Sequence, residues 1–366
     1  MPTLIQLLPI DTPFRSFIIT YYVYVLGILI SFIILFQGFG FVDITYPAYL
    51  SMIIDHHSSG IPADKGYLLE GLLGDLIGIF YLLLGFSPPT AMIMWWSTGI
   101  ILLSLVVMMS VKYRVIDLVD LILLVAFSRL VDTLALWTPK FDPYLVAALI
   151  LSVNKNKPAA ITGVGIAAFL HPSIAIVSTV GVVILRAAFE KIWFVEAVII
   201  VLLMAAIDLY LFHHFLPSLY NRAEYVNREV YTLIMTSVRW GPVAFMGSII
   251  VPFLMMSYFK TLPKSPCAYC SGLLILWIIL VVTLSCVLSF DHTRVSCLLT
   301  VAPTIVFLRS TQWRDEQQKH EFIVVFAVFF LARIVIPHVQ GLGLNLGAWG
   351  SVFRVFHVWP DVWRGV

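Results

Sequence analysis

Long apolar segments cover most of this chain and leave no loop long enough to fold separately. About 20 apolar residues cross the hydrocarbon core of a bilayer as a helix. The clear candidate segments are 16–36, 67–84, 91–111, 115–137, 192–215, 241–259, 271–290, 295–308 and 321–336. Only 11% of the residues are charged, whereas soluble domains carry about 25%. The sequence therefore predicts an all-α fold, a polytopic bundle of transmembrane helices.

Two shorter apolar pieces lie in the middle of the chain, at 143–153 and 159–185. The second piece is interrupted at His171-Pro172, and proline both removes a backbone donor and kinks a helix. A carbonyl freed inside a membrane must bond to water or to a neighbouring segment. We therefore expect a broken helix or a hairpin of half-helices at this point, and about 9 to 11 spans in all.

A single transmembrane domain is expected over residues 1–338, followed by a tail over residues 339–366. The tail mixes tryptophan and phenylalanine with arginine, histidine and aspartate. Such a mixture is typical of the lipid headgroup level, so the tail is predicted to lie along the interface. The chain is thus predicted to be a multi-pass protein integral to the cell membrane, which in a bacterium is the cytoplasmic, or inner, membrane.

Basic residues in short loops predict the orientation of the bundle. Lys155, Lys260 and Arg309 lie in or next to such loops, which the positive-inside rule assigns to the cytoplasm. One crossing per segment, however, would place Arg114 on the outer face. One segment between residues 67 and 153 is therefore miscounted.

The polar sequence Asp291-His292-Thr293-Arg294 separates two long apolar runs. Asp and Arg at the centre of a membrane helix each cost roughly 2.5 to 3.5 kcal/mol, so these side chains must face water, each other or a charged ligand. Arginine holds phosphate with parallel donors, and Asp or His beside it can accept a proton. A salt bridge between Asp291 and Arg294, at i and i+3, is the alternative. Arg333 in the last apolar run and His338 just beyond its end join this group.

Two other predicted outer loops carry candidate residues. The first contains carboxylate, phenol and imidazole side chains, namely Asp43, Tyr46, Asp55, His56 and His57. These residues suit a general base or a divalent cation, or are simply solvated. The loop 213–240 contains Arg222 and Arg239 among aromatic residues that can stack on sugars and hold phosphate. His171 beside the predicted break serves either packing or function.

Ionisable residues also fall inside apolar segments. They are Asp75, Asp117, Asp120, Arg129, Asp132 and Asp208. Asp117 shares a helix face with Asp120, and Arg129 with Asp132, so internal ion pairing is the simplest interpretation, although such residues also mark functional sites. Cys267 and Cys270 form a single CxxC, which is either a pair of cysteines where a helix begins or a redox or metal pair.

A family resemblance enters through the stretch from Phe141-Asp142-Pro143-Tyr144, through Asn154-Lys155-Asn156-Lys157-Pro158, to Phe169-Leu170-His171-Pro172-Ser173. This stretch resembles membrane glycosyltransferases and polymerases that use polyprenyl-linked sugars. The His171 region and the loop 291–295 are similar to those of EpsG-like and Wzy-like polysaccharide polymerases, and Asp43 resembles the acidic residue of GT-C glycosyltransferases. Two features depart from the families, because no paired acidic motif follows the first span and the arginine-bearing loop is short.

The resemblance implies a transferase for O-antigen or exopolysaccharide synthesis. A sugar hydroxyl would attack a glycan held on a polyprenyl phosphate or diphosphate, such as undecaprenyl phosphate, at the outer face. The implied catalytic residues are Asp43, Asp291, His171 and His292. The implied substrate-binding residues are Arg294, Arg222, Arg239, Arg333, His338 and Tyr46. Its partners would be the lipid-linked glycan, the bilayer and other envelope polysaccharide assembly proteins, without nucleic acid, a certain cofactor or an assigned metal site, although a divalent cation could take part.

Two other classes of protein remain open. A transporter or flippase would use the broken helix at His171 and the buried carboxylates as a midplane site. A membrane O-acyltransferase would use His171 with an acyl donor. The location of the polar groups distinguishes the glycosyltransferase from the transporter. A glycosyltransferase of this kind gathers its polar groups toward one face, whereas a transporter gathers them at the midplane with access from both sides.

Overall fold

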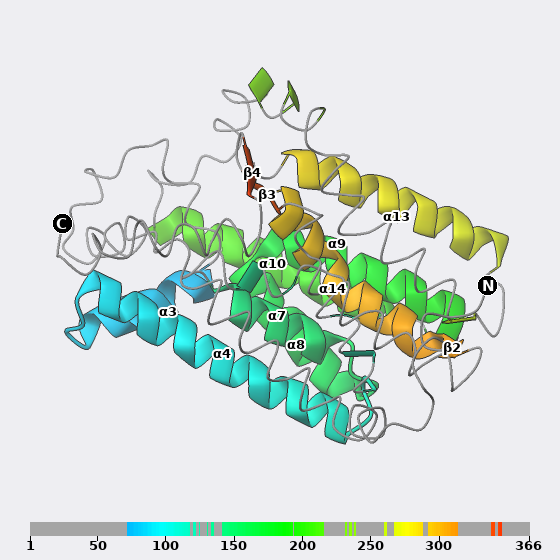
Figure 1. The fold of residues 1–366 in the computed structure, drawn as a ribbon, viewed down its shortest axis with the longest axis horizontal. Coiled ribbons are helices and arrows are strands. Elements are labelled where there is room, and N and C mark those ends of the chain that lie inside the picture. The colour runs from blue at the N-terminus through cyan, green and yellow to red at the C-terminus, as the bar shows by residue number, and fades with distance from the viewer. Residues whose placement is uncertain are drawn as a thin grey trace, which may run out of the picture.

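The described helices follow the apolar segments of the sequence. The protein is seen in a computed structural model, which describes residues 72–117, 120–121, 124, 130, 133–134, 141–192, 194–215, 231–232, 234–235, 238, 260–261, 267–287, 292–313, 338–340 and 343–345. Its α-helices are α3 (Leu72–Leu83), α4 (Pro88–Lys112), α7 (Asp142–Ser152), α8 (Lys157–Leu170), α9 (Pro172–Leu185), α10 (Val195–Phe215), α13 (Ala268–Val287) and α14 (His292–Ser310). They form one layered bundle (Figure 1).

Three of these helices are long and apolar enough to cross a membrane, counted over the described residues alone. The qualifying segments are Met94–Lys112, Pro172–Glu190 and Ala268–Ser285. Only 22% of the first and third segments is buried inside the protein, so α4 and α13 present apolar side chains outward. Large exposed apolar surfaces are typical of contact with lipid. The fold is thus helical and suited to a membrane, and the larger number of spans stays a prediction.

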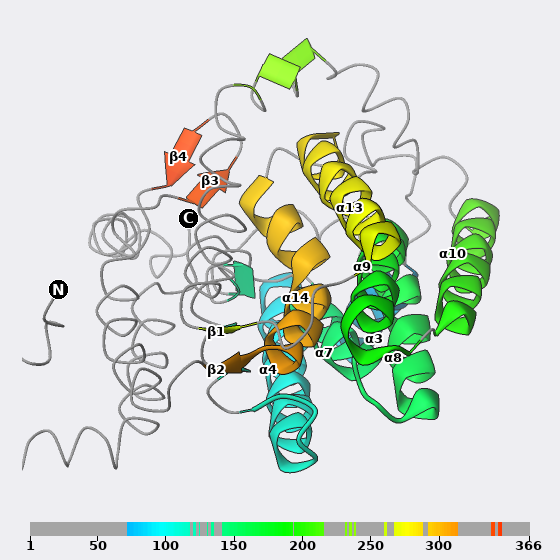
Figure 2. The same cartoon turned by 90° about the vertical axis from the view of Figure 1, so that its right-hand side faces the viewer.

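Helix α7 occupies the middle of the described bundle. It packs against α8, α4 and α14, and every residue except Leu151 is buried. Helix α9 packs in turn against α14, α10, α13 and α8. Figure 2 shows α4, α10 and α13 around α7 and α9. A helix that is apolar on all sides is stable when other helices enclose it, as α7 is here.

The predicted break at His171-Pro172 is confirmed. Helix α8 ends at Leu170 and α9 begins at Pro172, while His171 between them has extended backbone angles, φ −159° and ψ 90°. The N–H at the first position of a helix has no acceptor within the helix, and proline lacks this N–H. Pro172 is therefore well suited to begin α9. A π-helical turn, η4 (Arg186–Glu190), then extends α9.

The hairpin of α8 and α9 returns the chain to the level at which α8 began. Arg186 at the end of α9 donates through Nη2 to the carbonyls of Val153 and Asn154, at 2.5 and 2.7 Å. Lys157 at the start of α8 pairs with Glu196 at the start of α10, at 2.7 Å. We call this level, where α7 and α9 end and α8 and α10 begin, the basic end. Helices α7, α9 and α14 begin away from the basic end.

Four short strands lie among the described residues, and the sequence does not predict these strands. Strand β1 (Lys260–Thr261) pairs antiparallel with β2 (Gln312–Trp313) at the basic end, directly after α14. Strand β3 (His338–Gln340) pairs antiparallel with β4 (Gly343–Asn345). Strand β3 contacts α14, near its first turn in Figure 1.

Candidate functional site

Among the ten residues predicted to be catalytic or substrate-binding, His171 and Arg294 have described side chains. His292 is the first residue of α14 and His338 is the first residue of β3, with their backbone described. The others lie outside the described residues, namely Asp43, Tyr46, Arg222, Arg239, Asp291 and Arg333. The histidines of the first predicted loop, His56 and His57, lie outside them too.

Arg294 forms a buried ion pair with Asp142. Its Nε and Nη2 donate to the two carboxylate oxygens of Asp142, both at 2.6 Å. The side chains are 3% and 0% exposed. Asp142 also begins α7, where the positive end of the helix dipole favours a carboxylate. Parallel bonds of this kind are the strong form of an arginine–carboxylate contact.

This pair is a contact that the hydropathy pattern does not predict. The pattern puts Arg294 in a polar loop with Asp291 as its alternative partner, and the pairing with Asp291 stays a prediction. Arg294 lies in the first turn of α14 and binds a residue 152 positions earlier in the chain. A guanidinium can lie inside the apolar bundle because Asp142 satisfies its charge. Asp291 itself lies outside the described residues.

His171 lies at the break between α8 and α9 and is 7% exposed. Its Nδ1 shares a hydrogen bond with Ser173 Oγ, at 3.1 Å. Its backbone N–H donates to the Ala167 carbonyl, and its own carbonyl accepts from Ala175 N–H, at 2.8 and 3.0 Å. The break therefore leaves these two backbone groups of His171 hydrogen-bonded, as the apolar surroundings require.

Phe141 contacts His171 and is the residue before Asp142. Its ring lies edge-on to the His171 imidazole, with the ring centroids 6.1 Å apart. We call Asp142, His171, Ser173 and Arg294 the central cluster. It lies where α7, α9 and α14 all begin, and helix N-termini favour negative charge.

The central cluster lies partway along α4 rather than at the end of that helix. Tyr144 in the first turn of α7 donates to the carbonyl of Trp95, at 3.0 Å, and also packs against Gly99. With 1.5 Å of rise per residue, Trp95 and Gly99 are about 10 and 16 Å from Pro88 along α4. The cluster is therefore inside the bundle, nearer to the start of α4 than to its end at Lys112.

Asp142 is the functional candidate that the sequence pattern missed. An Asp-Pro pair directly before the apolar run 143–153 is the available signal, because acidic residues and proline both favour the first turn of a helix. That signal predicts where α7 begins. The Asp-Pro signal does not predict that Asp142 pairs with Arg294, because this contact depends on how α7 and α14 pack.

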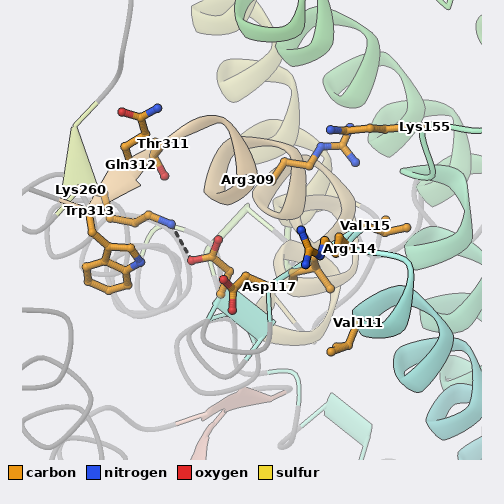
Figure 3. A pocket seen from close by; sticks show the side chains of 12 residues that line it. Val111, Arg114, Val115, Asp117, Lys155, Lys260, Arg309, Thr311, Gln312 and Trp313 are labelled. Atoms are coloured by element: carbon orange, nitrogen blue, oxygen red, sulfur yellow. Dashed lines mark hydrogen bonds and ion pairs between the residues drawn. The ribbon is translucent and has the colours of Figure 1, made fainter. Parts of the chain in front are cut away.

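A second polar site lies at the basic end. A cavity of about 740 Å³, which we call the basic-end pocket, opens between the end of α4, the α7–α8 turn and the β1–β2 pair. The described residues that line it are Val111, Arg114, Val115, Ile116, Asp117, Asp120, Lys155, Lys260, Arg309, Thr311, Gln312 and Trp313. Figure 3 shows Arg114, Arg309 and Lys155 across the pocket from Lys260 and Trp313.

The carboxylates Asp117 and Asp120 prove to have different surroundings. Asp120 is buried and accepts from Lys260 Nζ at 2.5 Å, and Lys260 lies over the Trp313 ring, 5.1 Å from its centroid. Asp117 is exposed at the pocket rather than inside a span, because the chain turns after Lys112. Asp208 in α10 is buried, as predicted, and Arg129 and Asp132 lie outside the described residues.

Arginines hold the helix ends together at this level. Arg309 near the end of α14 binds both carboxylate oxygens of Glu190, and its Nη1 donates to the Val153 carbonyl. Arg186 donates to the same carbonyl. Cationic side chains at helix C-termini satisfy carbonyls that have no partner within the helix. Three elements, α7, η4 and α14, are thus fastened to one another beside the pocket.

The CxxC pair lies where α13 begins. Cys267 is exposed and precedes the helix, whereas Cys270 is buried, and the Cys270 backbone N–H donates to Cys267 Sγ at 3.3 Å. Hydrogen bonds from the thiol and the backbone N–H of Cys270 lower the pKa of Cys267 below its usual range. In the part of the chain that the structure describes, no three His, Cys, Asp or Glu side chains are grouped to hold a metal ion.

No protein-family model, curated protein or solved structure matches this chain.

Proposed function

We propose that this protein is a multi-pass membrane glycosyltransferase, of the kind that polymerises polysaccharides from polyprenyl-linked donors. The observation that carries the proposal is the central cluster. A carboxylate and a guanidinium form an ion pair inside an apolar bundle where three helices begin, and the ring of Phe141, next to Asp142 in the chain, contacts the imidazole of His171. Ionisable residues are costly in such surroundings and are functional candidates by default.

The transfer needs a proton acceptor and a site for negative charge. A sugar hydroxyl attacks the anomeric carbon, a new C–O bond forms, and the bond from that carbon to the phosphate oxygen breaks. The hydroxyl proton passes to His171, whose ring Ser173 orients through Nδ1. The electron pair of the broken C–O bond stays on the polyprenyl phosphate or diphosphate. Arg294 and the N-termini of α7, α9 and α14 stabilise the negative charge of this leaving group.

The proposed orientation puts the basic end in the cytoplasm, because cytoplasmic loops carry an excess of Lys and Arg. The start of α4 then faces outward, and the central cluster lies in the outer half of the bundle. A polyprenyl chain can approach it through lipid. Asp43 and Asp291 remain proposed alternatives for the base, and His292 remains a proposed catalytic residue. The proposed contacts to the substrate remain Arg222, Arg239, Arg333, His338 and Tyr46.

The test is glycan transfer by the purified protein in nanodiscs, with a polyprenyl diphosphate-linked oligosaccharide as donor. His171→Asn should lower the rate by about 10²- to 10⁴-fold, the usual contribution of general acid–base catalysis. Ser285→Ala, at a buried serine of α13, is the control and should keep the wild-type rate. Thermal unfolding of each variant separates loss of catalysis from loss of fold. A His171→Asn variant with normal stability and the wild-type rate would contradict the role of His171.

A transporter is the second candidate, because α7 and α8 are too short to cross the membrane. Their 11 and 14 residues extend about 16 and 21 Å, whereas the hydrocarbon core is about 30 Å thick. Discontinuous helices with N-termini near the midplane are common at transporter substrate sites. Movement of a labelled glycolipid across proteoliposomes, without formation of longer glycans, would favour this candidate over the transferase.

A further inference from the structure

We infer that the basic-end pocket binds a phosphate group, carried either by a lipid headgroup or by a soluble molecule. This site is separate from the central cluster and does not depend on the proposed function. Arg309 at the pocket and Arg294 in the cluster are fifteen residues apart on α14, which corresponds to about 22 Å along the helix. A cavity of about 740 Å³ is within the usual range of ligand sites, roughly 300 to 1,000 Å³.

The charges of the pocket favour an anion. Among the described residues that line the pocket, four are cationic and two are carboxylates. Lys260 is paired with Asp120, and Arg309 with Glu190. Within the described residues, neither Arg114 nor Lys155 takes part in an ion pair. The pocket therefore offers two cations that other described side chains do not neutralise, and arginine is well suited to phosphate because its donors match two oxygens at once.

The backbone at Arg114 supports a role in binding. Its φ is 53°, in the left-handed region, which is strained for any residue other than glycine. Strain of this kind concentrates at ligand sites. The same turn directs the chain away from α4, and Arg114 lines the pocket together with Arg309 and Lys155 (Figure 3).

The apolar wall of the pocket suits an amphiphile as well as a soluble anion. Val111, Val115 and Ile116 line the pocket beside the cations, and the neighbouring turns of α4 expose Met108 and Met109 on the surface of the helix. A headgroup in the pocket could thus keep its acyl chains against α4. Trp313 supplies an aromatic side chain of the kind common at the headgroup level.

The strained backbone provides a clean test. Arg114→Gly removes the guanidinium and suits the left-handed conformation, so the fold should be kept. Lys191 also has a left-handed φ, 56°, but does not line the pocket, so Lys191→Gly is a control with the same charge loss and the same backbone effect. Binding of inorganic pyrophosphate to detergent-purified protein is measured by calorimetry. Retention of phosphatidylglycerol or phosphatidylcholine in nanodiscs is measured by native mass spectrometry.

We expect Arg114→Gly to weaken pyrophosphate binding or phosphatidylglycerol retention at least about tenfold, since a hydrogen bond to a charged group contributes roughly 1.5 to 3 kcal/mol. Lys191→Gly should bind as the wild type does. An effect on pyrophosphate identifies a soluble phosphate compound as the source, and an effect on phosphatidylglycerol alone identifies a lipid headgroup. The inference is overturned if the wild type binds neither probe, or if the two variants bind alike.

Discussion

At the scale of single residues, the ion pair between Asp142 and Arg294 allows two charged side chains to be buried inside an apolar bundle. Removing one member leaves the other buried without its partner, which costs roughly 3 to 5 kcal/mol. We therefore expect Arg294→Met and Asp142→Leu to destabilise the protein by that amount each, and the double variant to lose much less than their sum. A double-mutant cycle on unfolding in detergent measures the coupling.

The matched control is the exposed pair between Lys157 and Glu196, whose side chains are 49% and 51% exposed. Exposed pairs contribute up to about 1 kcal/mol, so Lys157→Gln and Glu196→Gln should have small and nearly additive effects. Equal coupling energies in the two cycles would contradict the interpretation that burial makes the Asp142–Arg294 pair strong.

At the scale of elements, the contact of α7 with α8 depends on a glycine. A Cβ at Gly163 would lie 2.5 Å from Ser152 N and 2.7 Å from the Ala148 carbonyl oxygen, and backbone atoms can give way only if the helices separate. Gly163→Ala should therefore destabilise the protein by about 1 to 3 kcal/mol, the usual cost of overpacking. The thermal unfolding temperature in detergent measures this loss.

Gly165 in the same helix is the control for this substitution. A Cβ at Gly165 would meet nothing within 4 Å, and alanine favours a helix over glycine by up to about 1 kcal/mol. Gly165→Ala should thus be neutral or stabilising. A similar loss in both variants would show that helix propensity, and not the contact with α7, explains the result.

At the scale of the whole molecule, the structure gathers the basic loops at one end. Arg114, Lys155, Lys260 and Arg309 line a single pocket, although one crossing per apolar segment separates Arg114 from the others. One segment between residues 67 and 153 is thus miscounted, because the end of α4 and Lys155 line the same pocket.

This arrangement predicts the result of cysteine labelling in intact cells. With Cys267 replaced by Ser, Lys112→Cys and Lys157→Cys should react with a membrane-impermeant maleimide only after lysis. Ser87→Cys, at the other end of α4, should react from outside. All three side chains are exposed. Ser87 is the N-cap of α4, Lys112 is the last residue of α4, and Lys157 is the first residue of α8. Labelling of Lys112→Cys and Lys157→Cys from opposite sides would refute the shared basic end.

The sequence by itself determined that the described elements are mainly helical and apolar, and that a helix breaks at His171-Pro172. Hydropathy and proline act locally, so they can be read from neighbouring residues. Only the tertiary structure decided that Asp142 pairs with Arg294, and that Arg114 shares a pocket with Lys155 and Lys260. These contacts join residues far apart in the chain, and they depend on which short helices end inside the bundle, where buried charge must find a partner.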